Sequence, residues 1–185
     1  MLASHALTPW KEGANPLHQF NVQLHRIRDV LHFSFEMSGS LNCLAVKSLK
    51  PKAERMRADE LWKTTCMEIF VGPRGHHEYI EFNLSPSGDW NAYTFDSYRK
   101  GMRPTDDAMI DLETVELTAD RFRMRGRLQS RREGELSDLL RLPHLEASAT
   151  AVIETAANEI QYWAVKHAGE KPDFHLRSSF SIELE

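Results

Sequence analysis

The sequence predicts an all-β domain, an antiparallel β-sandwich, because apolar and polar residues alternate along much of the chain. Each alternating run places its apolar side chains on one face of a strand, as Phe20 and Val22 do in the first run. Short turns rich in glycine, proline and small polar residues separate the runs, among them Ser38–Ser40, Gly72–Gly75 and Ser87–Asp89. Many short strands joined by regular turns are typical of sandwiches and barrels.

The strands are predicted in order along the chain, each bounded by turn residues. They are Phe20–His25, Leu31–Met37, Leu41–Lys47, Thr64–Val71, Glu78–Leu84, Trp90–Phe95, Ile110–Leu117, Phe122–Leu128, Glu146–Thr155, Ile160–His167 and Phe180–Leu184. Helix is scarce, and we expect at most one or two short helices. A one-sided leucine stripe predicts a helix over Glu135–Leu142, ended by Pro143. The charged segment Lys50–Leu61 is expected to form a loop or a single helical turn.

The composition favours one domain over residues 1–185. Of the 185 residues, 41% are hydrophobic and 27% are charged, which is enough apolar material for a core. A net charge of -4 and a sequence pI of about 6.1 lack the basic footprint of a nucleic-acid binder. No apolar run could span a bilayer and the first residues lack a signal-peptide pattern, so we expect a cytoplasmic protein without membrane contact. Cys43 and Cys66 have no metal-binding spacing and are expected as buried free thiols.

Two groups of polar residues have simple structural explanations. The alternating arginines of Arg121–Arg127 face Glu113 and Glu116 across a predicted hairpin, so we expect a solvated sheet face rather than an anion site. His76 and His77 lie at a glycine-rich turn without a visible third ligand, so we expect no metal site there.

Two neighbouring strands are predicted to place carboxylates on the same face of a sheet. In Glu78–Leu84, positions 80, 82 and 84 point to the core, which leaves Glu81 and Asn83 on the opposite face. In Thr64–Val71, positions 67, 69 and 71 make the core set and leave Glu68 on that opposite face. A hairpin between the two strands therefore brings Glu68 close to Glu81 and Asn83.

Residues 162–167 add aromatic and basic side chains at the edge of this face. Trp163 and His167 alternate with Tyr162 and Lys166, so either Trp163 or Tyr162 looks away from the main core. Aromatic rings can pack against the C–H patches of a sugar, while carboxylates and amides bond its hydroxyls. Aromatic surfaces with a few placed polar groups are the general pattern of small-ligand sites. The sequence therefore predicts a non-catalytic site for a carbohydrate or a similar small polar ligand.

Four segments together resemble the bacterial DOMON-like domain proteins, which are similar to the family 9 carbohydrate-binding modules. They are Leu61–Val71, Tyr79–Phe95, Tyr162–His167 and Lys171–His175. The first two segments carry most of the resemblance, because their long runs match in register. It covers the chain from about Leu31 to the C-terminus and implies a jelly-roll-like β-sandwich.

In the family 9 modules, two tryptophans sandwich a sugar and polar residues bond its hydroxyls. By this resemblance, Trp62 matches a tryptophan at a strand entry and Glu68 matches a glutamate of the family, whereas threonines at 64 and 65 replace an acidic pair of secreted members. Trp90 and Trp163 are both candidates for the second tryptophan.

The loop that follows Trp90–Phe95 is expected to complete the site. It would place Tyr98 and Arg99 near the rim, where Arg99 could clamp a carboxylate or phosphate of the ligand. A structural alternative ties Glu68 and Glu81 to Arg99 or Lys166, since buried charges are normally paired.

Three other functions stay open. Some DOMON domains hold a b-type haem between methionine and histidine, and the candidates here are His167, His175, Met37, Met67 and Met102. A hydrolase could divide acid and base roles between the two glutamates if their carboxyl groups lie about 5 to 9 Å apart. The domain could instead contact another protein through its edge strands or polar face, which would also allow a homodimer.

Overall fold

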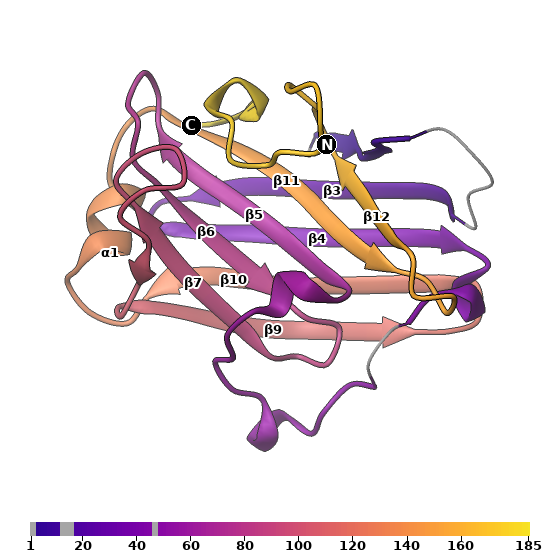
Figure 1. Cartoon of the computed structure of the whole chain (residues 1–185). Coiled ribbons are helices and arrows are strands. Elements are labelled where there is room, and N and C mark those ends of the chain that lie inside the picture. The colour runs from indigo at the N-terminus through magenta and orange to yellow at the C-terminus, as the bar shows by residue number, and fades with distance from the viewer. Residues whose placement is uncertain (1–2, 12–16, 46–47) are drawn as a thin grey trace.

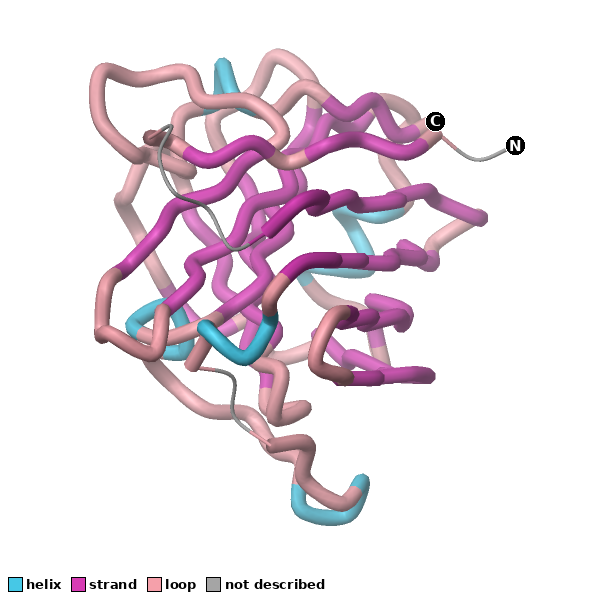
Figure 2. The backbone as a smooth tube through the Cα atoms, turned by 90° about the vertical axis from the view of Figure 1, so that its right-hand side faces the viewer, coloured by secondary structure: helices cyan, strands magenta, loops and turns pink. Residues whose placement is uncertain are grey.

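Two antiparallel sheets packed face to face make up the molecule (Figure 1). The structure is a computed structural model that describes residues 3–11, 17–45 and 48–185. Figure 2 shows from the side that most of the regular structure in these residues is strand. The predicted all-β sandwich is therefore confirmed.

The smaller sheet has the strand order β1-β3-β4-β10-β9. Its strands are β1 (Ser4–Ala6), β3 (Leu17–Ile27), β4 (Val30–Gly39), β10 (Arg121–Ser130) and β9 (Ala108–Leu117). Its outer face carries the arginines of β10. Arg127 forms ion pairs with Asp111 and Glu113, and Arg123 forms one with Glu36, as expected of a solvated face.

The larger sheet has the order β2-β12-β11-β5-β6-β7-β8, and β13 pairs with β11. Its strands are β2 (Thr8–Pro9), β12 (Ile160–Ala164), β11 (Leu145–Glu154), β5 (Cys66–Pro73), β6 (Tyr79–Leu84), β7 (Trp90–Phe95), β8 (Arg103–Pro104) and β13 (Ile182–Leu184). The β5–β6 hairpin pairs Glu68 with Asn83 and Phe70 with Glu81, which is the register that the candidate site requires.

The described residues contain one α-helix, α1 (Glu135–Leu140), and four short 3-10 helices. The 3-10 helices are Leu41–Cys43, Lys52–Glu54, Leu61–Lys63 and Arg177–Ser179. None of the helices in the described residues is both long and apolar enough to cross a membrane.

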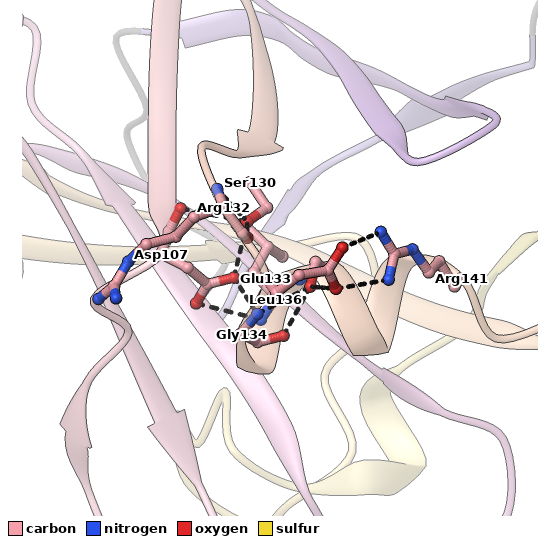
Figure 3. A network of polar contacts seen from close by, with 8 residues as sticks. Asp107, Ser130, Arg132, Glu133, Gly134, Leu136 and Arg141 are labelled. Atoms are coloured by element: carbon pink, nitrogen blue, oxygen red, sulfur yellow. Dashed lines mark hydrogen bonds and ion pairs between the residues drawn. The ribbon is translucent and has the colours of Figure 1, made fainter.

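The carboxylate of Asp107 anchors the start of α1 (Figure 3). It accepts hydrogen bonds from the backbone amides of Leu136 and Ser137, at 3.0 and 3.1 Å, and from the hydroxyl of Ser130 at 2.8 Å. Helix N-termini leave amide donors without helical partners, and a carboxylate there satisfies them. Asp107 thereby ties the helix to the end of β10.

Three local expectations were wrong. Leu41–Lys47 was expected to form a strand, but Leu41–Cys43 is a 3-10 helix, and residues 46 and 47 lie outside the described residues. Cys43 was expected to be buried and is exposed, whereas Cys66 is buried; both are free. The short strands β1, β2 and β8 were not expected, because two or three residues are too few to show alternation.

The main core lies between the two sheets. Ile80, Phe82 and Leu84 enter it from β6, and Met67, Ile69 and Val71 enter it from β5, as the alternation predicts. A second apolar cluster lies on the opposite face of the larger sheet. Its members are Phe70, Tyr79, Tyr93, Phe95, Val152, Ala164, Phe174 and Phe180. The larger sheet is thus covered by apolar side chains on both faces.

Replacing Ile80 by alanine should lower the free energy of unfolding by roughly 2–5 kcal/mol, because it removes buried methylene groups and leaves a cavity. Ile80 is 3% exposed. Ile27→Ala is the matched control, since Ile27 is 55% exposed, and it should change stability by no more than about 0.5 kcal/mol. Urea unfolding of both variants measures the difference, and equal losses would contradict this placement of the core.

Candidate functional site

The outer face of the larger sheet presents its polar residues in cross-strand rows. Glu68 on β5 lies between Thr150 of β11 and Asn83 of β6. Glu81 on β6 lies between Phe70 of β5 and Tyr93 of β7. Glu68 and Glu81 are therefore diagonal neighbours, a relation in which two residues of an antiparallel sheet lie about 7 to 8 Å apart, with their Cβ atoms somewhat closer.

Residues from the C-terminal segment and from the start of β5 cover this face. Phe174 and Phe180 join the outer apolar cluster, and Trp62 packs edge-on against Tyr93 with ring centroids 5.7 Å apart. Every residue of β5 and β6 is buried as a result. Carboxylates normally lie on the solvated face of a strand, but β5 and β6 are covered on both faces and have no solvated face.

An open cavity of about 490 Å³ lies in this cover and reaches the two glutamates. Aromatic side chains and the two carboxyl groups dominate its wall. The lining residues are Trp62, Glu68, Glu81, Phe95, Arg99, Met102, Val152, Tyr162, Lys171, Pro172, Phe174 and His175. The volume is in the range of small-ligand sites, about 300 to 1,000 Å³.

Both glutamates are almost fully buried, with 3% of Glu68 and 5% of Glu81 exposed. Glu68 Oε2 accepts a hydrogen bond from the hydroxyl of Thr150 at 3.0 Å, and Glu81 Oε1 accepts one from the amide of Asn83 at 2.8 Å. Burial raises the pKa of Glu81 to about 7, against the opposing effects of Asn83 and Arg99. Burial and the charge of Glu81 together raise the pKa of Glu68 well above its usual range.

His175 stands beside the carboxyl pair as a neutral ring. Its Nδ1 lies 2.7 Å from the hydroxyl of Tyr79, which itself accepts a hydrogen bond from the backbone amide of Arg99. Tyr79 can donate its proton to Nδ1, and in that tautomer the ring proton is on Nε2, 3.9 Å from Glu81 Oε2. Burial, aided by the charge of Arg99, lowers the pKa of His175 to about 4, so the ring is uncharged at neutral pH.

Asp173 joins the rim loop to the C-terminal segment. Its carboxylate accepts hydrogen bonds from the hydroxyl of Tyr98 at 2.5 Å, from the guanidinium of Arg99 at 3.0 Å and from the backbone amide of His175 at 3.2 Å. Burial opposes ionisation of Asp173, but these hydrogen bonds outweigh it and lower the pKa of Asp173. The positive charge of Arg99 is therefore already balanced within the protein.

The structure brings four of the predicted site residues to one cavity, namely Trp62, Glu68, Glu81 and Arg99. Tyr98 does not line the cavity; it is 46% exposed and bonds Asp173, which also holds Arg99. Asn83 is on the expected face but is completely buried beneath the cavity, where it supports Glu81. Its expected role as part of the cleft wall is therefore corrected to support of the carboxyl group.

Three other candidates lie away from this cavity. Trp163 faces the main core, where its ring packs 5.8 Å from that of Phe20, because β12 directs Tyr162 to the outer face instead. Trp90 also packs against the main core, under the guanidinium of Arg57. His167 bonds the carbonyl of Thr8 at the β2 edge.

Three residues line the cavity but were not predicted as site residues from the sequence, namely Tyr162, Phe174 and Lys171. Adjacent residues of β12 point to opposite faces of the sheet, and the sequence did not decide whether Tyr162 or Trp163 faces the core. Residues 171–175 belong to an irregular segment without periodicity. Lys171 and Phe174 do lie within the Lys171–His175 motif that carries the family resemblance, and this was the available signal.

The cavity is the place to test the haem alternative. Met37 and Met67 are buried in the main core, whereas His175 and Met102 line the cavity. Both ring nitrogens of His175 already face protein partners, Tyr79 and Glu81, so the residues present fit an axial haem ligand poorly. Among the described residues, no group of three or more metal-ligating side chains is gathered.

The contribution of Glu81 to stability should fall as the pH rises from about 4.5 to 7. Its pKa is raised from 4.5 to about 7 in the folded protein, so the stabilisation is complete below about 4.5 and is lost as the pH rises through about 7. His175, with its pKa lowered from 6.5 to about 4, has the opposite slope between about pH 4 and 6.5, so the contribution of Glu81 is read from the difference between the wild type and a Glu81 variant.

Thermal melts of the wild type and of Glu81→Gln measure this dependence. The variant keeps the hydrogen-bond acceptor for Asn83 and lacks this fall, so its melting temperature relative to that of the wild type should rise as the pH rises from about 4.5 to 7. Glu36→Gln, which changes an exposed carboxylate on the other sheet, should keep the wild-type slope. Parallel profiles for wild type and Glu81→Gln would show that Glu81 is ionised throughout.

Comparisons with known proteins support the fold. No family model matches the sequence, and no curated protein matches it. Among solved structures, the chain is similar to a "putative carbohydrate-binding protein" from Bacteroides uniformis, with a TM-score of 0.65 and 11% sequence identity. The similarity covers 100% of this chain and 87% of that chain. At this identity the likeness shows a shared fold, the β-sandwich described above.

Proposed function

We propose that this domain binds a carbohydrate or a similar small polar ligand in the cavity on the outer face of the larger sheet. The observation that carries the proposal is the pairing of aromatic walls with two buried carboxyl groups that open into the same cavity. The similar fold of a protein described as carbohydrate-binding adds support.

The cavity offers both kinds of contact that a sugar needs. Trp62, Tyr162 and Phe174 provide flat apolar surfaces, which suit the C–H faces of a pyranose ring. Glu68, Glu81 and His175 provide acceptors and donors deep in the cavity for hydroxyl groups. A site that hydrogen-bonds ligand hydroxyls through buried groups also rejects ligands that lack them, because those groups would then be unpaired.

A structural network is the rival explanation of the carboxyl pair. It would require Glu68 and Glu81 to be neutralised by basic side chains of the protein. Within the described residues, no lysine or arginine forms an ion pair with either group, and Arg99 pairs with Asp173 instead. The carboxyl pair is thus better explained by a ligand than by the protein's own charges.

Tyr162→Ala should weaken ligand binding about tenfold or more, because it removes an aromatic wall of the cavity. Its effect on the melting temperature should be small, since Tyr162 is 38% exposed. Isothermal titration calorimetry with a panel of mono- and disaccharides measures the affinity.

Ile160→Ala is the matched control for this experiment. Ile160 lies on the same strand, is 39% exposed and does not line the cavity, so its loss should leave affinity unchanged. The proposal fails if no saccharide or related polyhydroxylated compound binds the folded wild type. It also fails if both variants bind equally well.

A further inference from the structure

We propose that the ligand of this cavity carries a protonated amino group, which Glu68 and Glu81 receive together at the cavity floor. The inference rests on the proposed function and narrows it to amino sugars and closely related hydroxylated amines. It follows from the charges, the free carboxyl oxygens and the aromatic walls of the site.

The two carboxyl groups lack a cationic partner in the protein. Thr150 and Asn83 each supply one neutral hydrogen bond, to Glu68 Oε2 and Glu81 Oε1. Glu68 Oε1 has no hydrogen-bond partner among the described residues, and Glu81 Oε2 has only the ring of His175 at 3.9 Å. Buried carboxylates are normally paired with a cation, because burial without one is costly.

The basic groups around the pair do not fill this role. Arg99 is held by Asp173, and Lys171 is an exposed residue of the cavity wall that forms no ion pair in the described structure. His175 faces Glu81 as a neutral ring. The other ionisable neighbours are acids, namely Cys66 on β5, Tyr79 on β6 and Tyr93 on β7, which bonds the carboxylate of Asp59. None of these acids supplies a positive charge.

The geometry suits a single ammonium group. Glu68 and Glu81 are diagonal neighbours on paired strands, and both open into the same cavity. An ammonium group has three donors, enough to bond Glu68 Oε1, Glu81 Oε2 and one further acceptor. Trp62, Phe95 and Phe174 line the cavity as well, and aromatic faces attract cations.

A neutral sugar would bind to a carboxyl pair in a different protonation state. With no cation present, the carboxyl groups would hold protons, because burial disfavours their charged forms. An ammonium ligand would instead displace those protons. Proton release on binding therefore separates an amine ligand from a neutral one.

The test compares glucosamine and galactosamine with glucose, galactose and N-acetylglucosamine by isothermal titration calorimetry at about pH 7. The amino sugars should bind the wild type at least about tenfold tighter than their neutral counterparts. Titrations in buffers of different ionisation enthalpy should show a net release of about half a proton or more per amino sugar bound, since the pKa of Glu81 is about 7.

Conservative variants locate the effect in the carboxyl pair. Glu68→Gln and Glu81→Gln keep an acceptor for Thr150 and Asn83, and each should reduce the preference for amino sugars about tenfold. Glu36→Gln, the matched control on the other sheet, should keep the wild-type preference for amino sugars. Circular dichroism verifies that each variant is folded, and retained binding of neutral sugars shows that its cavity is intact.

Each outcome bears on the two proposals separately. Equal or tighter binding of glucose or N-acetylglucosamine overturns the amine inference and leaves carbohydrate binding standing. Absence of binding by every sugar overturns both. Cyclohexylamine, which has no hydroxyl groups, is the remaining probe. If it binds as tightly as glucosamine, the contact between the ammonium group and the two carboxyl groups stands, but the carbohydrate proposal falls, and with it the narrowing to amino sugars.

Discussion

The covering of the larger sheet on both faces is the constraint on which the site depends. A strand pair with one solvated face could carry Glu68 and Glu81 as ordinary surface carboxylates. Here the inner face packs against the smaller sheet, and the outer face lies under an aromatic layer that includes Phe174 and Phe180. Two carboxyl groups are therefore held where water is scarce, and an opening in the cover is the route by which another molecule can reach them.

A few polar contacts fix the cover above the sheet. Asp173 receives the side chains of Tyr98 and Arg99, and Tyr79 joins His175 to the backbone of Arg99. Arg99 has a positive φ of 53°, an uncommon conformation for a residue with a side chain. In this conformation its amide donates to the hydroxyl of Tyr79 and its guanidinium donates to Asp173. The cavity wall is thus held by interactions between segments that are about 75 residues apart.

The sequence predicted the longer strands and the side of the sheet on which each glutamate lies, because alternation and the hairpin register determine both. It did not predict how deeply they are buried, because alternation does not report what covers the second face. The choice between Tyr162 and Trp163 depends on the register of the strand, because a shift by one residue exchanges the side chains on its two faces. His175 was noticed only as a haem ligand, since its place in the site arises from an irregular segment without a local pattern.

The carboxyl pair is the centre of this account, and its ionisation can be measured directly. Carbon-13 NMR of protein labelled at the glutamate side-chain carboxyl carbons, titrated from about pH 4 to 9, reports each group, and Glu68→Gln and Glu81→Gln assign the two resonances. The account predicts that Glu81 titrates near pH 7 and that Glu68 titrates well above the usual range of a glutamate. Titration of both groups below about pH 5 would show that they are solvated or paired with a cation of the protein, and would contradict it.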